Sequence, residues 1–281
     1  AADATNSDDH HENDESTVNE MVFFSAATAQ WPQPPTSIVN MNSGVEPNCS
    51  DSSRPTSTPL AARCSAVVRA RPQSALDACQ ACTPIALVAA EQRLQQQQHD
   101  AAADPTAADL ERWIVAGREL HRQVLGALER EQPSRNDDNV TVNEVFRHCE
   151  LNVRWIVQPF GLVARDPEVG ARLRRALGTL QPGQAAVVVY STEWTVAVVC
   201  IGDNTGAVWY ELVDSHACDQ RGLPHGRLGA IGASQSLWAR FATLDALAAH
   251  LEALFPGVDV QYTMDVVELE TPPLPSSLSF S

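Results

Sequence analysis

The 281-residue sequence lacks several features that mark whole classes of protein. No stretch approaches the roughly 18 uninterrupted apolar residues that a membrane-spanning helix needs. Residues 1–20 are acidic, whereas a secretory or mitochondrial targeting segment would be basic. Positive charge is also scarce, since the net charge is -16 at pH 7 and a nucleic-acid backbone attracts a basic face. We therefore expect a soluble protein that binds neither membranes nor nucleic acid.

Cysteine is too sparse to suggest a disulfide framework. The seven cysteines are odd in number and irregularly spaced, unlike the paired cysteines of a small secreted domain. This pattern favours a reducing, intracellular compartment, and we expect a cytoplasmic monomer. A zinc site would need two well-spaced ligand pairs, but His148 and Cys149 are adjacent. We expect no metal and no cofactor.

Composition divides the chain into three parts. Residues 1–72 are rich in Asp, Glu, Asn, Ser, Thr and Pro, and the first 60 hold nine acidic side chains against Arg54 alone. Such a segment buries too little apolar surface to offset its ordering entropy, so we expect a largely disordered acidic arm. The tail, residues 270–281, has a similar composition and should be flexible. Residues 73–269 should form the compact domain.

The order of predicted elements in residues 73–269 indicates the fold class. Helical spacing and capping residues predict helices first, at 83–98, at 107–131, after Thr141, and from Asp166 to Gly178. β-Branched runs then predict strands at 185–190, 195–201, 207–213, 237–241 and 258–269, with one helix starting at Thr243. The strands at 195–201 and 207–213 should pair as a central hairpin. Helices followed by a sheet indicate an α+β fold.

Two cysteines precede the first predicted helix, in the stretch LDACQACTPIAL. The Cys82 thiol would lie beside unpaired backbone N–H groups at the positive end of the helix dipole, which favours a nucleophilic thiolate. Alternatively, Cys82 is a small buried apolar residue at a helix start. The spacing of Cys79 and Cys82 is also that of a redox pair, but the preceding sequence does not resemble the buried strand that such a motif follows.

A histidine held by a carboxylate would support a nucleophilic cysteine. The segment WYELVDSH runs from a predicted strand into Asp214 and His216, and residues i and i+2 of an extended chain face the same side. Asp214 can then orient the His216 ring; the alternative is a turn with a solvated charge. A side-chain amide upstream of Cys82, from Gln73 or Gln80, could stabilise an oxyanion together with the Cys82 backbone N–H.

The order of a cysteine at a helix start, a later strand and then Asp-x-His resembles that of papain-like cysteine proteases. More narrowly, the sequence resembles the deubiquitinase domain of herpesvirus large tegument proteins and the related viral-tegument-like deubiquitinases. The resemblance is carried by QACTPIAL around Cys82, by EWTVAVVCIGDNTGAVWYELVDSH, and by the following LWARFATLDALAAHL. It implies a papain-like catalytic domain, in which an N-terminal helical part packs on a central antiparallel sheet.

The same resemblance implies residue roles and a substrate. Cys82 would be the nucleophile, His216 the general base and acid, Asp214 the residue that orients it, and Gln73 an oxyanion-hole donor. The implied activity is thiol-dependent cleavage of the isopeptide bond after the C-terminal glycine of ubiquitin, with ubiquitin or ubiquitin chains as the partner. The cleft should be narrow, because ubiquitin ends in Gly-Gly. Three tryptophans could line this cleft or belong to the core: Trp155, Trp194 and Trp238.

Two other functions stay open at the level of sequence. The domain could be a papain-fold peptidase, amidase or acyltransferase with a non-ubiquitin substrate, since a Cys–His pair does not name a substrate. It could also be a non-catalytic ubiquitin- or partner-binding domain, in which Cys82 and His216 are structural. Thiol reactivity separates the enzymes from the binding domain, because a catalytic Cys82 should alkylate near neutral pH far faster than a free thiol.

Overall fold

The computed structural model describes residues 64–76, 80–100, 103–162, 169–190, 194–220, 222–223, 235–254 and 262–270. The acidic arm expected before residue 64, the tail expected after residue 270 and Cys79 lie outside the described residues. No helix in the described part of the chain is long and apolar enough to cross a membrane.

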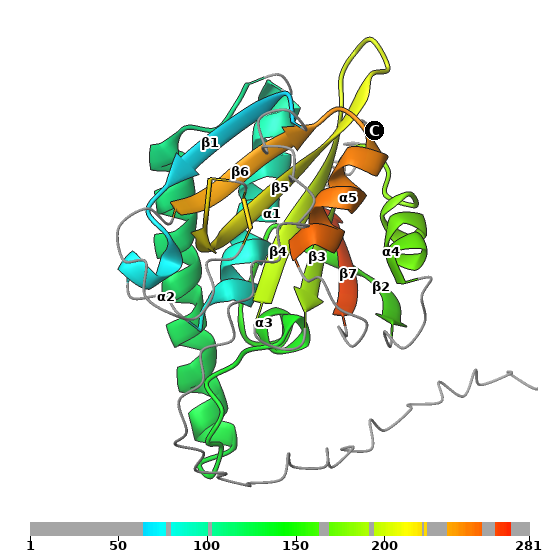
Figure 1. Cartoon of the computed structure of the whole chain (residues 1–281). Helices are drawn as coiled ribbons and strands as arrows, with labels where there is room; N and C mark the ends of the chain where they lie inside the picture. Colours follow the sequence, from blue (N-terminus) through cyan, green and yellow to red (C-terminus); the bar gives the residue numbers. More distant parts are fainter. Residues whose placement is uncertain are drawn as a thin grey trace, which may run out of the picture. The chain divides into compact units, whose positions relative to one another are not determined.

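The described strands form one antiparallel sheet of seven strands, in the order β1-β6-β5-β4-β3-β7-β2 (Figure 1). The β4–β5 hairpin lies near the middle of this sheet, as predicted, so both of its faces can be covered. The strand bounds are β1 Ala66–Ala70, β2 Val153–Leu162, β3 Gln184–Tyr190, β4 Trp194–Gly202, β5 Val208–Cys218, β6 Gln235–Phe241 and β7 Tyr262–Leu269.

Helices cover both faces of the sheet. Helices α1, α2 and α3 lie on one face, and α4 and α5 lie on the other (Figure 1). Both α2 and α3 begin with a capping box, formed by Thr106 with Asp109 and by Thr141 with Glu144. The helix bounds are η2 Gln73–Leu76 (a short 3-10 helix), α1 Cys82–His99, α2 Ala107–Glu131, α3 Val142–His148, α4 Val169–Leu177 and α5 Leu244–Leu254.

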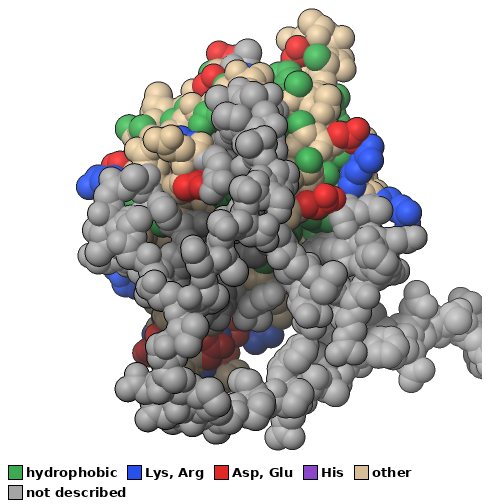
Figure 2. Space-filling model, in the orientation of Figure 1, with side chains coloured by type: hydrophobic (Ala, Val, Ile, Leu, Met, Phe, Trp, Pro, Cys, Tyr) green, Lys and Arg blue, Asp and Glu red, His purple; other side chains and the backbone are tan. Residues whose placement is uncertain are grey.

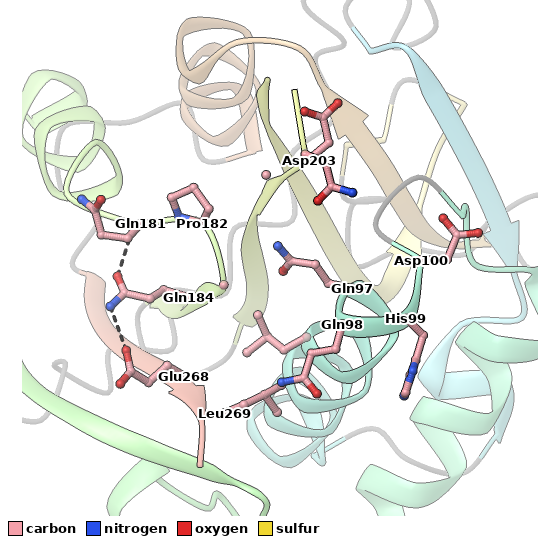
Figure 3. A pocket seen from close by; sticks show the side chains of 14 residues that line it. Gln97, Gln98, His99, Asp100, Gln181, Pro182, Gln184, Asp203, Glu268 and Leu269 are labelled. Carbon is pink, nitrogen blue, oxygen red and sulfur yellow. Dashed lines mark hydrogen bonds between the residues drawn. The ribbon is translucent and has the colours of Figure 1, made fainter. Parts of the chain in front are cut away.

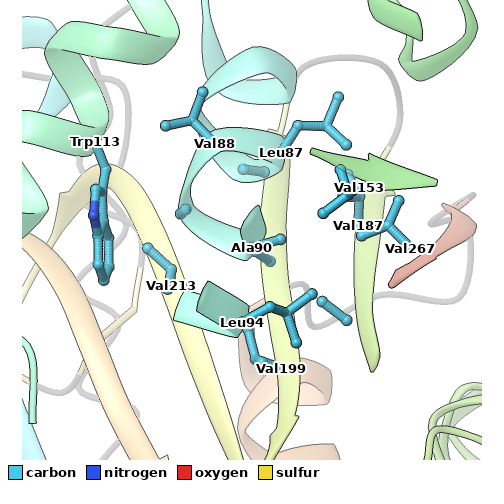
Figure 4. Close-up of a cluster of buried hydrophobic side chains, with 14 of the residues drawn as sticks. Leu87, Val88, Ala90, Leu94, Trp113, Val153, Val187, Val199, Val213 and Val267 are labelled. Atoms are coloured by element: carbon cyan, nitrogen blue, oxygen red, sulfur yellow. The ribbon is translucent and has the colours of Figure 1, made fainter. Parts of the chain in front are cut away.

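The central strands are apolar on both sides because each face of the sheet has its own core. Val187 and Val199 pack toward α1, where they meet Leu87 and Leu94 (Figure 4), whereas alternate residues such as Val198 face α4 and α5. Helix α1 is buried along its first ten residues. A helix buried in this way between a sheet and a second helix cannot shift without disturbing the core.

The structure confirms the predicted α+β class and corrects some element bounds. Residues 66–70, expected in the acidic arm, form β1 and pair with β6. Strand β2 was not predicted. Strand β7 is described from Tyr262, and residues 258–261 of the expected strand lie outside the described residues. Strand β5 continues to Cys218, beyond its expected end at residue 213. Edge strands such as β1 and β2 are short or irregular, and their partners are distant in sequence, so local patterns show them poorly.

Candidate active site

Cys82 is the first residue of α1, as predicted. Its side chain is 5% exposed, and the preceding Ala81 supplies no side-chain cap to the first turn. The thiol lies at the start of the helix, where the Thr83 backbone N–H lowers its pKa. The next residue, Thr83, forms a buried hydroxyl–hydroxyl hydrogen bond of 3.0 Å with Thr195 of β4. This bond fixes the start of α1 against the sheet.

Asp214 and His216 meet at an irregularity in β5. The pairing of β5 with β6 shifts register between Asp214 and Cys218, so that β5 carries extra residues there. Asp214 is fully buried, and its Oδ1 accepts hydrogen bonds from His216 Nδ1 at 2.7 Å and from the His216 backbone N–H at 2.9 Å. The carboxylate thus fixes both the ring and the backbone of His216.

Trp194, the first residue of β4, contacts both members of the Asp214–His216 pair. Its ring stacks on the His216 imidazole, with 3.7 Å between ring centroids and 16° between ring planes. Its indole N–H donates to Asp214 Oδ2 at 3.2 Å. The Cys218 thiol donates to the same oxygen at 3.4 Å. Both carboxylate oxygens are therefore engaged, and the imidazole is held on its face and on one edge.

The electrostatics of Cys82 and His216 favour a charged pair. Burial disfavours the imidazolium, but the charge of Asp214, its hydrogen bond and the neighbouring Cys82 raise the pKa of His216 to about 9. Burial likewise opposes ionisation of Cys82, but His216, Thr195 and the Thr83 backbone together lower the pKa of the thiol. Because Asp214 occupies Nδ1, Nε2 is the ring nitrogen available to the thiol; it is buried and has no other hydrogen-bond partner within the described residues. Both shifts act in the direction of a thiolate–imidazolium pair.

The two candidate glutamines differ in their surroundings. Gln80 is exposed, whereas Gln73, in η2, is 4% exposed. The Gln73 Oε1 accepts a 2.8 Å hydrogen bond from the Ser215 hydroxyl, and Ser215 lies between Asp214 and His216. The structure thus ties Gln73 to the strand that carries the histidine, with its carbonyl side facing Ser215.

The other described cysteines are poor nucleophiles. Burial raises the pKa of Cys200 to about 11. Burial and the nearby Asp214 charge raise the pKa of Cys218 well above its ordinary value, which keeps it a thiol. Burial also raises the pKa values of Cys64 and Cys149. Among the described cysteines, Cys82 differs in having its pKa lowered.

Sequence reasoning missed the part that Trp194 plays. It named Trp155, Trp194 and Trp238 together, but Trp155 stacks on Phe146 and Trp238 is fully buried in the core. The hairpin contained a signal for this contact. Ala197 pairs with Val213 in the antiparallel register, and extending that register by three residues on each strand places Trp194 opposite His216. Counting outward from the turn could have singled it out.

Other surface features lie away from these residues. A cavity of about 720 Å³ is lined by polar residues such as Gln97, Gln184 and Glu268 (Figure 3), at the C-terminal end of α1. Since α1 spans 18 residues, at 1.5 Å per residue this end lies about 25 Å from Cys82. On the face shown in Figure 2, hydrophobic side chains are scattered among polar ones. The described residues contain no cluster of three or more His, Cys, Asp or Glu that could hold a metal ion.

Comparison with known proteins supports the fold. No family model matches the sequence, and no curated protein is similar to it in sequence. The ubiquitin-specific protease encoded by murine cytomegalovirus tegument protein M48, solved in complex with a ubiquitin-based suicide substrate, matches with a TM-score of 0.51 and 15% identity, over 75% of this chain and 90% of that one. The Pseudomonas avirulence protein AvrPphB matches with a TM-score of 0.39 and 11% identity, over 72% and 96% of the two chains, which is too distant to carry an argument. The predicted papain-like cysteine protease fold, and the resemblance to a viral tegument protease at the level of fold, are confirmed.

Proposed function

We propose that the protein is a thiol-dependent deubiquitinase that cleaves the isopeptide bond after the C-terminal glycine of ubiquitin. One observation carries the proposal: Cys82 at the start of α1 has a lowered pKa, beside a histidine whose pKa is about 9 and whose Nδ1 is bound to the buried Asp214. This combination is what a cysteine nucleophile with its base requires. The fold match with a ubiquitin-specific protease supports ubiquitin as the substrate.

In the proposed reaction the Cys82 thiolate attacks the carbonyl carbon of the terminal glycine. A carbon–sulfur bond forms, and the carbonyl electron pair moves onto oxygen. As the intermediate collapses, the carbon–nitrogen bond breaks and His216 passes its Nε2 proton to the leaving lysine amine. Water then attacks the thioester with His216 as base. The carbon–sulfur bond breaks, which releases the ubiquitin carboxylate and restores the thiolate.

Gln73 and the Cys82 backbone N–H are the proposed donors to the oxyanion. The hydrogen bond from Ser215 fixes the carbonyl side of the Gln73 amide, which orients its Nε2 side away from Ser215. Burial supports Gln73 over the exposed Gln80, because a donor in a dry site stabilises developing charge more strongly. Replacing Gln73 by Ala should lower kcat on the order of 10²-fold, and Gln80→Ala is the matched control that should leave it unchanged.

The first test is incubation with ubiquitin that carries a thiol-reactive group at its C-terminus, followed by intact mass measurement. We expect one ubiquitin adduct on the native chain and on Cys79→Ala, and none on Cys82→Ala. All 19 basic residues of the chain are arginine, so no lysine side chain can accept ubiquitin and complicate the mass. Cleavage of di-ubiquitin by the native chain then tests turnover.

The other outcomes identify the other functions. If ubiquitin gives no adduct but Cys82 alkylates rapidly at neutral pH, the protein is a cysteine hydrolase with a different substrate. If ubiquitin forms no adduct and Cys82 is no more reactive than a free thiol, the protein is a binding domain and the proposed activity is wrong.

A further inference from the structure

A fully buried ion pair joins the helix of Cys82 to the strand of His216. Arg93 of α1 and Glu211 of β5 both have 0% exposed side chains. The Arg93 guanidinium makes a two-pronged contact with the carboxylate, from Nε to Oε2 and from Nη2 to Oε1, the latter at 2.9 Å. Two buried charges are costly unless their geometry is good and their remaining atoms are satisfied. A pair at this position therefore needs an explanation beyond simple core filling.

The Glu211 carboxylate is also held from the sheet side. The indole N–H groups of Trp209 and Trp238 donate to it at 3.0 Å and 3.1 Å. Arg240 of β6 donates to Glu211 Oε1 at 3.1 Å. Glu211 is thus fixed to the sheet by three side chains, and Arg93 is the group that connects α1 to it. The network therefore fixes the height of α1 on β5, that is, the position of the helix along the direction of the strand.

Along α1 and along β5, the ion pair lies at a similar distance from the Cys82–His216 pair. Arg93 lies 11 residues after Cys82, which is about three turns and about 16 Å along the helix, on nearly the same face. Glu211 lies five residues before His216, which is at most about 16 Å along the strand, because β5 is irregular after Asp214. Helix α1 and strand β5 run in opposite directions, so each distance leads from the ion pair toward the reactive pair. A slip of one helical turn, about 5.4 Å, would separate Cys82 from His216.

We propose that the Arg93–Glu211 pair is a positioning device that sets the height of α1 on β5 and so holds the Cys82 thiol opposite the His216 imidazole. Arg93 and Glu211 act through α1 and β5 and touch neither sulfur nor imidazole. The inference rests on the Cys82–His216 pair of the proposed function but not on ubiquitin as the substrate. Helix α1 also makes polar contacts from Thr83 to Thr195 and from Glu91 to Asn152, but the two-pronged ion pair joins α1 to the strand of His216 and has one good geometry.

The test measures the reactivity of Cys82 as a function of pH in Arg93→Met/Glu211→Gln. This double variant removes both buried charges while it keeps similar side-chain volume and an acceptor for the tryptophans. Labelling of the Cys82 peptide by iodoacetamide is followed by mass spectrometry from pH 5 to 10. We expect the folded double variant to label at pH 6 at least tenfold more slowly, since each unit of thiol pKa changes the thiolate fraction about tenfold. A wild-type pH profile in the folded double variant would overturn the proposal.

Two further variants separate positioning from general loosening. Arg93→Lys keeps the charge but not the two-pronged contact; it should fold and label more slowly at pH 6, and a wild-type profile here would also count against the proposal. Arg135→Met/Glu144→Gln removes an ion pair that is 15% and 16% exposed, between the segment after α2 and helix α3. It should lower the melting temperature without moving the Cys82 profile. An equal shift in this control would show that loosening alone explains the effect.

Discussion

Gly117 allows α2 to approach the first turn of α1, and adding one methyl group there should disturb both stability and the reactive cysteine. A Cβ at position 117 would lie 2.5 Å from Ile85 Cα and 2.7 Å from Ile85 N, where ordinary contacts begin at 3.4 Å. The backbone of Ile85, three residues after Cys82, would have to retreat by about 0.9 Å. Overpacking of this kind costs about 1–3 kcal/mol. A shift of close to 1 Å at a reactive group lowers kcat on the order of 10²-fold.

Gly126 of the same helix supplies the matched control. A Cβ at position 126 would meet only the flexible end of Arg130, at 3.8 Å. Gly126→Ala should therefore stabilise α2 by up to about 1 kcal/mol, as alanine does in a helix interior. Chemical denaturation gives the free energy of unfolding, and hydrolysis of a fluorogenic ubiquitin amide, or iodoacetamide labelling of Cys82, gives the reactivity. If Gly117→Ala proves as stable and as reactive as Gly126→Ala, the close approach of α1 and α2 does not position the cysteine.

Three further predictions concern Trp194, the pH dependence of the reactive pair and the capping box of α3. Trp194→Phe keeps an aromatic ring on His216 but loses the hydrogen bond from the indole N–H to Asp214. We expect a roughly tenfold lower kcat/KM with normal folding. An unchanged kcat/KM would show that this hydrogen bond does not contribute to activity. Activity should rise with pH through the lowered Cys82 pKa and fall as His216 deprotonates near pH 9. Because the pKa of His216 is raised in the folded state, its contribution to stability should be complete below about pH 6.5 and should be lost as the pH rises through about 9. Urea unfolding of the native chain and of His216→Gln at several pH values measures this contribution. Thr141→Ala removes the capping box of α3 and should cost about 1 kcal/mol in denaturation with no change in Cys82 labelling.

Local patterns predicted the elements whose signals lie within one segment. The helix that became α2 has apolar spacing and a capping residue of its own, and α1 has Pro84 in its first turn, followed by residues of high helix propensity. The β4–β5 hairpin has a turn sequence between two β-branched runs. The edge strands have no such signal. Strand β1 is five residues long and obtains its backbone hydrogen bonds from β6, about 170 residues later, which no local window contains.

The sequence by itself determined the chemistry that each candidate residue could perform. It placed Cys82 at a helix start and spaced Asp214 and His216 two residues apart on a strand, because helix capping and strand alternation are local properties. Only the tertiary structure decided which residues meet. Trp194 against His216, Gln73 against Ser215 and Arg93 against Glu211 are contacts between elements. Burial opposes the charged form of His216, and its neighbour Asp214 on β5 raises its pKa. The tertiary contribution is to bring α1 to β5, where His216 lowers the pKa of the Cys82 thiol against the effect of burial.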